Sequence, residues 1–567
     1  MTRLARPRFE RTRRLLSTFR VLAASPVSRY PGGTLIGAVA KALRGEGRVA
    51  GMALEKRPPD LLGNSAWNAM AFVVAVVLNL AILPFVIARL GLPAFGVAGL
   101  VTACIAPALV FSNALGLSTA RELAQRLEPS DREDARRLFA TAISVAAGAG
   151  GLITIFFWVA GAPLARLGFH LAGLAADDLG LAFTLASAGW LCQCVSAVFV
   201  SLFTARQDYR RIASIGIGST VTSTLSMLLF IPAAPYASTF LGCQALGFAA
   251  GLLMALVWSR GMRQWLALPA LHREALGKLV RMGGWQVAAQ GGALLAGQAD
   301  RYLLGALLQP QFVGFYGVAQ RLQEATYIGI LKVGEILFPF FSTLQRESED
   351  RKVDLLFRSS WILNVLAASA LGALIPVAGP LLHVWTGAEV AAEAARVLVV
   401  LAIAGILGSS ANVFGFYLLA QARSRSNALI ALVTGVVTLV TSVIVLPSFG
   451  WQAAGWSVCA GMIAQMATIV VLLRRSFDLP GIWPRVIHCV LMPLGIGIAT
   501  ALGLRYGLDR ALFQLAPSWW SVGVVSSLTA AIIFVVEVAA SQLGPYRNAC
   551  WQDLRAILSR FVPLKAI

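Results

Sequence analysis

The amino-acid sequence predicts an all-α polytopic membrane protein with about 14 transmembrane helices, built as two parallel six-helix lobes followed by two C-terminal helices. Three observations predict this fold class. The composition is strongly apolar, with 58% hydrophobic and only 13% charged residues among 567, against about 45–50% and about 25% in an average soluble domain. Long apolar runs recur without the strict alternation of lipid-facing β-strands, which excludes a closed barrel. The two halves of the chain also share a pattern at a constant offset.

Apolar windows bounded by charged residues, glycine or proline give the candidate spans. A helix that crosses the hydrocarbon core of a bilayer needs about 20 apolar residues. The first seven spans are expected near residues 64–88, 95–117, 137–160, 180–203, 210–231, 237–259 and 283–308. The second seven are expected near residues 312–343, 359–377, 394–419, 426–446, 452–473, 486–504 and 518–543.

The distribution of basic residues predicts the orientation of these spans. The net charge is +21, and most of the 47 Lys and Arg residues fall in the termini or in every second loop. Because loops rich in Lys and Arg stay in the cytoplasm, both termini are expected there. The same residues attract the anionic headgroups of membrane lipids. Their position between apolar runs argues against a nucleic-acid partner.

Three short matches between the two halves share one offset of 217 residues and lie at equivalent span ends. They are Pro93-Ala94-Phe95 with Pro310-Gln311-Phe312, Pro163-Leu164 with Pro380-Leu381, and Ala205-Arg206 with Ala422-Arg423. Six spans in each half predict parallel repeats, with the substrate site between the lobes. We expect an N-lobe over residues 61–260, a C-lobe over 261–475, two further spans over 476–545 and a cytoplasmic tail over 546–567.

Residues 1–60 form a separate basic extension. They carry 13 Lys and Arg residues and no apolar run of span length, so we expect a disordered cytoplasmic segment on the anionic inner leaflet. A translation start at Met52, twelve residues before the first span, is an equal alternative.

The span at 312–343 carries four charged residues. Arg321, Glu324, Lys332 and Glu335 project within an arc of about 80° at about 100° per residue. A charged side chain near the bilayer centre costs about 2.5–3.5 kcal/mol on insertion scales. We therefore expect this face to line a pathway inside the bundle.

The span at 283–308 repeats this pattern more weakly. Gln286, Gln290, Asp300 and Arg301 fall within an arc of about 100°, whereas Gln298 lies off this face. The two polar faces are expected to line one cavity.

A purely structural interpretation of these charges stays open. Arg321 with Glu324, and Lys332 with Glu335, are i,i+3 pairs that could neutralise each other as packing contacts. Lys332 and Glu335 could also lie at the cytoplasmic surface, because the span is long.

The sequence lacks the motifs of common enzymes. It has no G-x-x-x-x-G-K-[ST] loop for nucleotide phosphates and no H-E-x-x-H or G-x-S-x-G motif, and its scattered cysteines complete no zinc set. We expect no enzymatic activity, no cofactor and no metal centre. A proton or sodium gradient, or consumption of the substrate on the far side, would then drive transport.

One segment resembles a known family. Asp300-Arg301-Tyr302-Leu303-Leu304-Gly305, followed by Val313-Gly314-Phe315-Tyr316-Gly317-Val318-Ala319, resembles the polysaccharide transporter family of lipid-linked oligosaccharide flippases. Ala88-Arg89-Leu90-Gly91 and Phe95-Gly96 form a similar first-half counterpart. The resemblance covers roughly residues 60–480. The family belongs to the superfamily of multidrug, oligosaccharidyl-lipid and polysaccharide exporters, which also contains the peptidoglycan precursor flippase.

The resemblance implies two six-helix lobes in a V around a central cavity, in the inner membrane of a bacterium. It implies an undecaprenyl-pyrophosphate-type glycolipid as substrate, moved to the outer leaflet for exopolysaccharide, O-antigen or capsule synthesis. Arg321 or Arg301 would attract the pyrophosphate, and Asp300, Glu324 or Glu335 would carry a coupling proton or cation. It also implies a monomer that works beside a polysaccharide polymerase and glycosyltransferases.

Two other functions remain as alternatives. A cation-coupled multidrug-type exporter would have about twelve spans without the final pair. A membrane glycan polymerase or ligase would need substantial outside loops with catalytic residues, and the expected outside loops are short.

Overall fold

The computed structural model describes residues 61–126, 129–169, 176–334, 348–421, 423–476, 482–512 and 517–542, and the single residues 337, 341 and 344. These residues form helices and short connections, with no β-strand among them. The basic extension at 1–60 and the tail at 546–567 lie outside the described residues.

The helices follow one another in a simple order. The first six are α3 (Leu61–Leu90), α4 (Leu92–Ala124), α5 (Arg132–Gly168), α6 (Ala176–Ala205), α7 (Tyr209–Phe230) and α8 (Ala237–Ser259). The next seven are α9 (Arg273–Leu307), α10 (Pro310–Gly334), α12 (Glu349–Gly372), α13 (Leu374–Thr386), α14 (Ala388–Ala420), α15 (Ser424–Phe449) and α16 (Ala454–Ser476). The last group is α17 (Ile482–Val486), the π-helical turn η6 (Ile487–Leu491), α18 (Met492–Leu512) and α19 (Trp519–Ser541).

These helices confirm the predicted all-α polytopic fold. Each of the fourteen expected spans overlaps one helix or consecutive helices of the described residues; the ninth is divided between α12 and α13, and the thirteenth passes through η6 into α18. The part of the eighth span after Gly334 lies mostly outside the described residues. Twelve helices of the described chain are long and apolar enough to cross a membrane. Neither α9 nor α10 is among these twelve, because both carry charged and amide side chains within the bundle.

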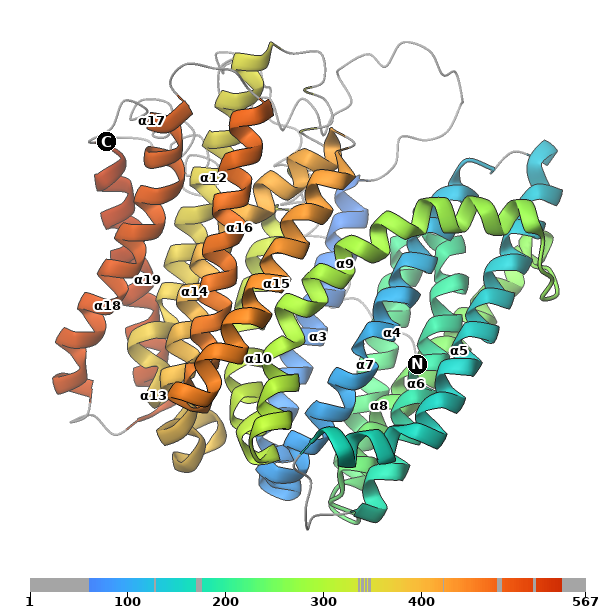
Figure 1. The fold of residues 1–567 in the computed structure, drawn as a ribbon, viewed down its shortest axis with the longest axis horizontal. Coiled ribbons are helices and arrows are strands. Elements are labelled where there is room, and N and C mark those ends of the chain that lie inside the picture. Colours follow the sequence, from blue (N-terminus) through green and yellow to red (C-terminus); the bar gives the residue numbers. More distant parts are fainter. Residues whose placement is uncertain are drawn as a thin grey trace, which may run out of the picture.

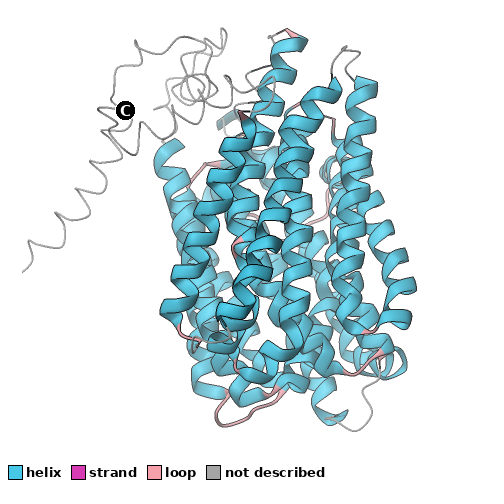
Figure 2. Cartoon of the chain, turned by 90° about the vertical axis from the view of Figure 1, so that its left-hand side faces the viewer, coloured by secondary structure: helices cyan, strands magenta, loops and turns pink. Residues whose placement is uncertain are grey.

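Two lobes form the bundle. In the N-lobe, α6 packs against α4, α5 and α8, and α7 packs between α3 and α8. In the C-lobe, α14 packs against α10, α12, α13 and α16, and α15 packs between α9 and α16. The pair α18 and α19 is added to the outer side of this lobe, where both helices contact α12 and α13. Figure 2 shows the long helices running side by side along the bundle.

The helix α9 joins the two lobes. It starts beside the N-lobe and bends towards the centre, where it runs next to α10 and α15 (Figure 1). The segment before it is fixed to α5, because the backbone N–H of His272 donates to Oγ1 of Thr141 at 3.1 Å and that of Ala270 donates to the carbonyl oxygen of Ala140 at 3.4 Å. One end of α9 therefore follows the N-lobe while its other end packs in the C-lobe.

The lobes meet where α4 and α10 begin, and the contact is reciprocal. A Cβ atom added to Gly96 would collide with the carbonyl oxygen of Pro310, and one added to Gly314 would lie 2.7 Å from the carbonyl oxygen of Leu92. Each glycine stands four residues after the first residue of its helix. A third contact is made by Trp385, whose indole N–H donates to the carbonyl oxygen of Leu80 at 3.1 Å. The positive-inside rule predicts that this end of the bundle faces outward.

Candidate functional site

A chain of polar side chains connects α9 to α10 at the centre of the molecule. The Nε atom of Arg301 donates to Oε1 of Gln320 at 3.0 Å, and Nη1 of Arg301 donates to Oε1 of Gln298 at 3.2 Å. The amide nitrogen of Gln320 donates to Oε1 of Glu324 at 2.7 Å and to the carbonyl oxygen of Gly297 at 3.3 Å. Arg301 is thereby fixed by two amides, and the carboxylate of Glu324 ends this series of hydrogen bonds.

The second cation of the site lies between the lobes. The guanidinium carbon of Arg321 lies 5.5 Å from the ring centroid of Phe95 on α4, and that ring packs edge-on against Phe240 of α8 at 6.0 Å. Within the described residues, Arg321 makes no ion pair with Glu324. A cation–π contact engages the face of the guanidinium and is worth about 0.5–2 kcal/mol. No hydrogen bond among the described residues engages the N–H donors of Arg321, which leaves them available to an anion.

A buried acid anchors the other side of α9. Asp300 is 1% exposed. Its Oδ2 atom accepts a hydrogen bond from the hydroxyl of Tyr316 at 2.7 Å, and Oδ1 accepts from the hydroxyls of Ser442 at 2.6 Å and Ser457 at 2.8 Å. The three donors come from α10, α15 and α16. Three helices thus place hydroxyl oxygens around the carboxylate that α9 carries, a set of oxygen atoms suited to a hard cation or a proton.

Consecutive residues of α9 point in different directions because the helix advances by about 100° per residue. Asp300 contacts the C-lobe helices and Arg301 contacts α10. The hydroxyl of Tyr302 donates to the carbonyl oxygen of Ala103 on α4 at 2.5 Å. This short segment therefore contacts both lobes and the polar chain between them.

The polar face of α10 continues beyond the charged cluster. The hydroxyl of Tyr327 donates to the carbonyl oxygen of Gly408 at 3.3 Å and accepts from the side-chain amide of Asn412 at 2.8 Å. Both partners lie on α14. With Gln320 and Glu324, Tyr327 forms a polar stripe at helical spacing.

The structure brings four of the eight predicted site residues together: Asp300, Arg301, Arg321 and Glu324. Gln290 is half-buried on α9, well before this group. Lys332 lies in the last turn of α10, eleven residues or about 16 Å beyond Arg321. The side chain of Gln286 and the whole of Glu335 lie outside the described residues.

One expectation about this site is wrong. Gln298 was expected to lie off the polar face, yet it accepts a hydrogen bond from Arg301. The two residues are one helical turn apart, and their long side chains bridge the angle between their positions. Sequence analysis did not identify Tyr316, Gln320, Ser442 or Ser457 as site residues. Gln320 could have been found from its position one turn before Glu324, whereas the serines give no local signal.

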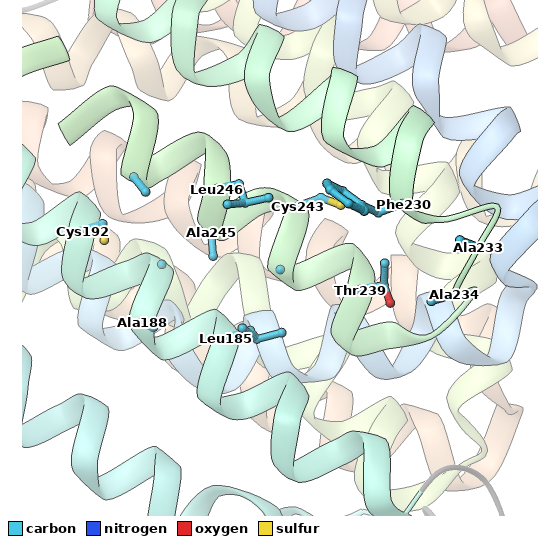
Figure 3. Close-up of a pocket in the computed structure, with 13 residues that line it drawn as sticks. Leu185, Ala188, Cys192, Phe230, Ala233, Ala234, Thr239, Cys243, Ala245 and Leu246 are labelled. Carbon is cyan, nitrogen blue, oxygen red and sulfur yellow. The ribbon is translucent and has the colours of Figure 1, made fainter. Parts of the chain in front are cut away.

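A different kind of cavity lies elsewhere in the N-lobe. It has a volume of about 580 Å³ and lies between α6 and α8, where its polar groups are the hydroxyl of Thr239 and the thiols of Cys192 and Cys243 (Figure 3). Its lining residues on α8 lie on a different side of that helix from Phe240, which faces Phe95. No charged residue lines this cavity, so it is separate from the charged cluster.

Comparison with known proteins gives one family and one fold. A family described as "Polysaccharide biosynthesis protein" matches residues 86–389, which is more than half of the chain. No curated protein matches the sequence. The fold is similar to the lipid II flippase MurJ in an inward closed conformation, with a TM-score of 0.63 and 10% identity over 86% of this chain and 99% of that chain.

Two further structures share the fold. One is a multidrug resistance MATE family transporter of the MOP superfamily in an inward-facing conformation, with a TM-score of 0.62 and 13% identity over 78% of this chain and 98% of that chain. The other is a MOP superfamily transporter from Pyrococcus furiosus, with a TM-score of 0.54 and 15% identity over 73% of this chain and 95% of that chain. At these identities the similarity is one of fold.

Proposed function

Because the chain belongs to the polysaccharide biosynthesis protein family, we propose that it flips a polyprenyl-pyrophosphate-linked oligosaccharide from the cytoplasmic to the outer leaflet of a bacterial inner membrane. The chain is a multi-pass membrane protein, and its fold is that of transporters. We propose no enzymatic activity for it. The flipped glycan would serve the synthesis of an exopolysaccharide, O-antigen or capsule.

The available guanidinium of Arg321 carries this proposal. A pyrophosphate cannot cross the hydrocarbon core without a polar and cationic route. Arg321 lies between the lobes with its hydrogen-bond donors unused by the described residues, and guanidinium groups bind phosphate oxygens in a bidentate manner. Arg301, already fixed by Gln320 and Gln298, adds a second positive charge. The polyprenyl tail can stay in the lipid throughout.

Amide side chains of the same face would bind the glycan. Gln290 lies half-buried on α9, and amides both donate to and accept from sugar hydroxyls. Lys332, in the last turn of α10, would meet the anionic headgroup at the cytoplasmic opening. We also propose that Gln286 binds the glycan and that Glu335 is a further candidate for carrying the coupling ion.

We propose Asp300 as the coupling site. A sodium ion or a proton bound there would change the hydrogen bonds to Tyr316 on α10 and to Ser442 and Ser457 on α15 and α16. Because Arg301 is the next residue on α9, such a change acts directly on the anion-binding side of that helix. Glu324 is the second carboxylate that could carry the coupling ion.

The proposed cellular setting is based on the positive-inside rule and on the family of the chain. Both termini would lie in the cytoplasm, and the protein would act as a monomer. Glycosyltransferases on the cytoplasmic side would supply the glycolipid, and a polysaccharide polymerase on the outer side would consume it.

Deleting the gene tests the proposal. The surface glycan should disappear while its lipid-linked precursor accumulates on the cytoplasmic side of the membrane. A wild-type copy should restore export, and a copy with Arg321→Gln should not. Unchanged glycan and precursor levels together with sensitivity to toxic compounds would instead favour the multidrug-type exporter.

A further inference from the structure

The two C-terminal helices contain a buried acid that lies outside the proposed substrate pathway. Glu537 of α19 is 2% exposed, and its Oε1 atom accepts no hydrogen bond within the described residues. The ion pairs of those residues all lie elsewhere. A carboxyl group in this position needs either a bound cation or a proton.

Three helices surround this carboxyl group. An added Cβ atom at Gly497 of α18 would lie 3.0 Å from Oε1 of Glu537 and 2.5 Å from the Cβ atom of Ala368 on α12. The acid therefore faces a narrow space between a glycine and an alanine. Both neighbours lack side-chain atoms that could bind a charge, and the donor they bring near the carboxyl group is the backbone N–H of Gly497.

The next helical turn repeats the same arrangement. An added Cβ atom at Gly372 of α12 would lie 2.7 Å from Cδ1 of Ile533 on α19 and 3.4 Å from Cβ of Ala501 on α18. Each of these three residues lies four positions, or about one helical turn, from the residue of the same helix that packs around the carboxyl group: Gly372 from Ala368, Ile533 from Glu537 and Ala501 from Gly497. The same helices hold two further buried hydroxyls without a partner among the described residues, Ser369 and Thr529. The interface is thus closely packed and poor in hydrogen-bond partners.

The other titratable groups on the helices that pack around Glu537 lie well away from it along the helix axes. On α18 and η6, Arg505 stands eight residues after Gly497 and His488 nine residues before it, which is about 12 Å or more along the axis. Arg505 is engaged by the carbonyl oxygen of Ile375 at 3.2 Å. On α12, Arg358 stands ten residues before Ala368 and pairs with Asp354 at 3.4 Å. On α13, His383 lies in the last turn.

We propose that Glu537 is a proton-binding site that controls the docking of α19 on α12 and α18. The protonated acid fits the apolar space, whereas the carboxylate would lack both water and a counter-ion. Loss of the proton would drive the side chain towards water and separate α19 from Gly497 and Ala368. This inference depends on the packing of the C-terminal helices and is independent of the proposed transport function.

Hydrogen exchange of the full chain in lipid nanodiscs tests this proposal. Wild type, Glu537→Gln and Thr529→Val would be measured at about pH 6 and again at about pH 10. The three proteins are compared with one another only within each pH, because the chemical exchange rate itself depends on pH. At the lower pH, the α19 amides of all three should exchange at equal rates. At the higher pH, wild type and Thr529→Val should exchange at least tenfold faster than Glu537→Gln.

The variants separate this inference from a structural role. Equal exchange of wild type and Glu537→Gln at both pH values would overturn it. Faster exchange of Glu537→Gln at both values would also overturn it, because the group would then be a structural acceptor. Loss of the pH effect in Thr529→Val would likewise overturn the proposal, because the hydroxyl of Thr529 does not titrate and its removal should leave the effect of Glu537 in place.

Discussion

The hydroxyl of Tyr316 donates a 2.7 Å hydrogen bond to Oδ2 of Asp300 and so fixes α10 to α9 in the middle of the bundle. One residue further along α9, Arg301 bonds to Gln320, which lies one turn after Tyr316 on α10. The acid and the cation therefore hold the same pair of helices at adjacent positions. A change at Asp300 cannot leave the position of Arg301 unaffected.

Removing the charge of Asp300 should uncouple transport from the ion gradient. Asn in place of Asp300 keeps one oxygen acceptor for Ser442 and Ser457 but cannot bind a proton or a hard cation as a carboxylate does. We expect Asp300→Asn to slow transport at least tenfold and to abolish its response to an imposed sodium or proton gradient. Transport into proteoliposomes under each gradient measures this effect.

Ser457→Ala serves as the control for that change. It removes one donor to Asp300 but keeps the charge, so the response to the gradient should remain. If Asp300→Asn responds to the gradient as wild type does, Asp300 is not the coupling site.

Arg321→Gln should weaken the binding of inorganic pyrophosphate to the purified protein by about 10–100-fold. A hydrogen bond to a charged group contributes about 1.5–3 kcal/mol, and each 1.4 kcal/mol is a factor of ten in affinity. Arg210→Gln is a matched control, because Arg210 packs on Trp67 at 5.6 Å, away from the polar chain. Titration calorimetry gives both affinities. An equal loss for the two variants would mean that binding depends on overall charge alone.

Gly96→Ala should disfavour the state in which α4 and α10 are in contact. The new methyl group would meet the carbonyl oxygen of Pro310, and overpacking of this kind costs about 1–3 kcal/mol. A cysteine placed at Gln320 should then react faster with a membrane-impermeant reagent from the outer side. Gly99→Ala is the control, because its Cβ atom would lie 3.7 Å from Cγ1 of Val313, an ordinary contact. Equal reactivity of the two variants would show that the close contact at Gly96 does not limit access to Gln320 from the outer side.

Asn364→Leu should lower the stability of the C-lobe by about 2–3 kcal/mol. Asn364 accepts from the hydroxyls of Ser409 and Ser410 at 2.8 and 2.7 Å and donates to the carbonyl oxygen of Cys489 in η6 at 3.1 Å. Leucine removes the hydrogen bonds that join α12 to α14 and η6, and of the two hydroxyls Ser409 keeps the carbonyl oxygen of Ile406 as an acceptor. The thermal unfolding midpoint in detergent should fall, whereas Ser360→Ala, which removes only a 3.4 Å contact, should change it little. An unchanged midpoint for Asn364→Leu would show that these hydrogen bonds between α12, α14 and η6 do not stabilise the C-lobe.

Most of the fold could be predicted because the bilayer constrains it so strongly. Backbone groups must be paired within each span, so the length and position of the apolar runs locate the helices. The sequence also indicated that the spans at 283–308 and 312–343 differ from the rest, and these became α9 and α10, which carry the polar chain. The π-helical turn η6 and the division of one span into α12 and α13 gave no clear signal in the sequence.

The candidate site was harder to predict because its partners are distant in the chain. Ser442 and Ser457 lie 142 and 157 residues from Asp300, and small hydroxyl residues are common in membrane helices. A helical projection gives the direction of each Cβ atom but not the reach of a long side chain, which is why Gln298 was placed wrongly. The alternative in which Arg321 forms an ion pair with Glu324 is not formed among the described residues, where Glu324 accepts from Gln320 instead.

The most direct test is to measure whether the purified full chain, in proteoliposomes, moves a fluorescent polyprenyl-pyrophosphate-linked sugar. It tests whether the pyrophosphate passes along the charged residues of α9 and α10. Wild type should move the glycolipid between leaflets. Arg321→Gln and Arg301→Gln should slow that movement at least tenfold at equal protein content, while Arg210→Gln keeps the wild-type rate. Movement by the two pathway variants at the wild-type rate would show that the charged residues between α9 and α10 do not form the route of the pyrophosphate.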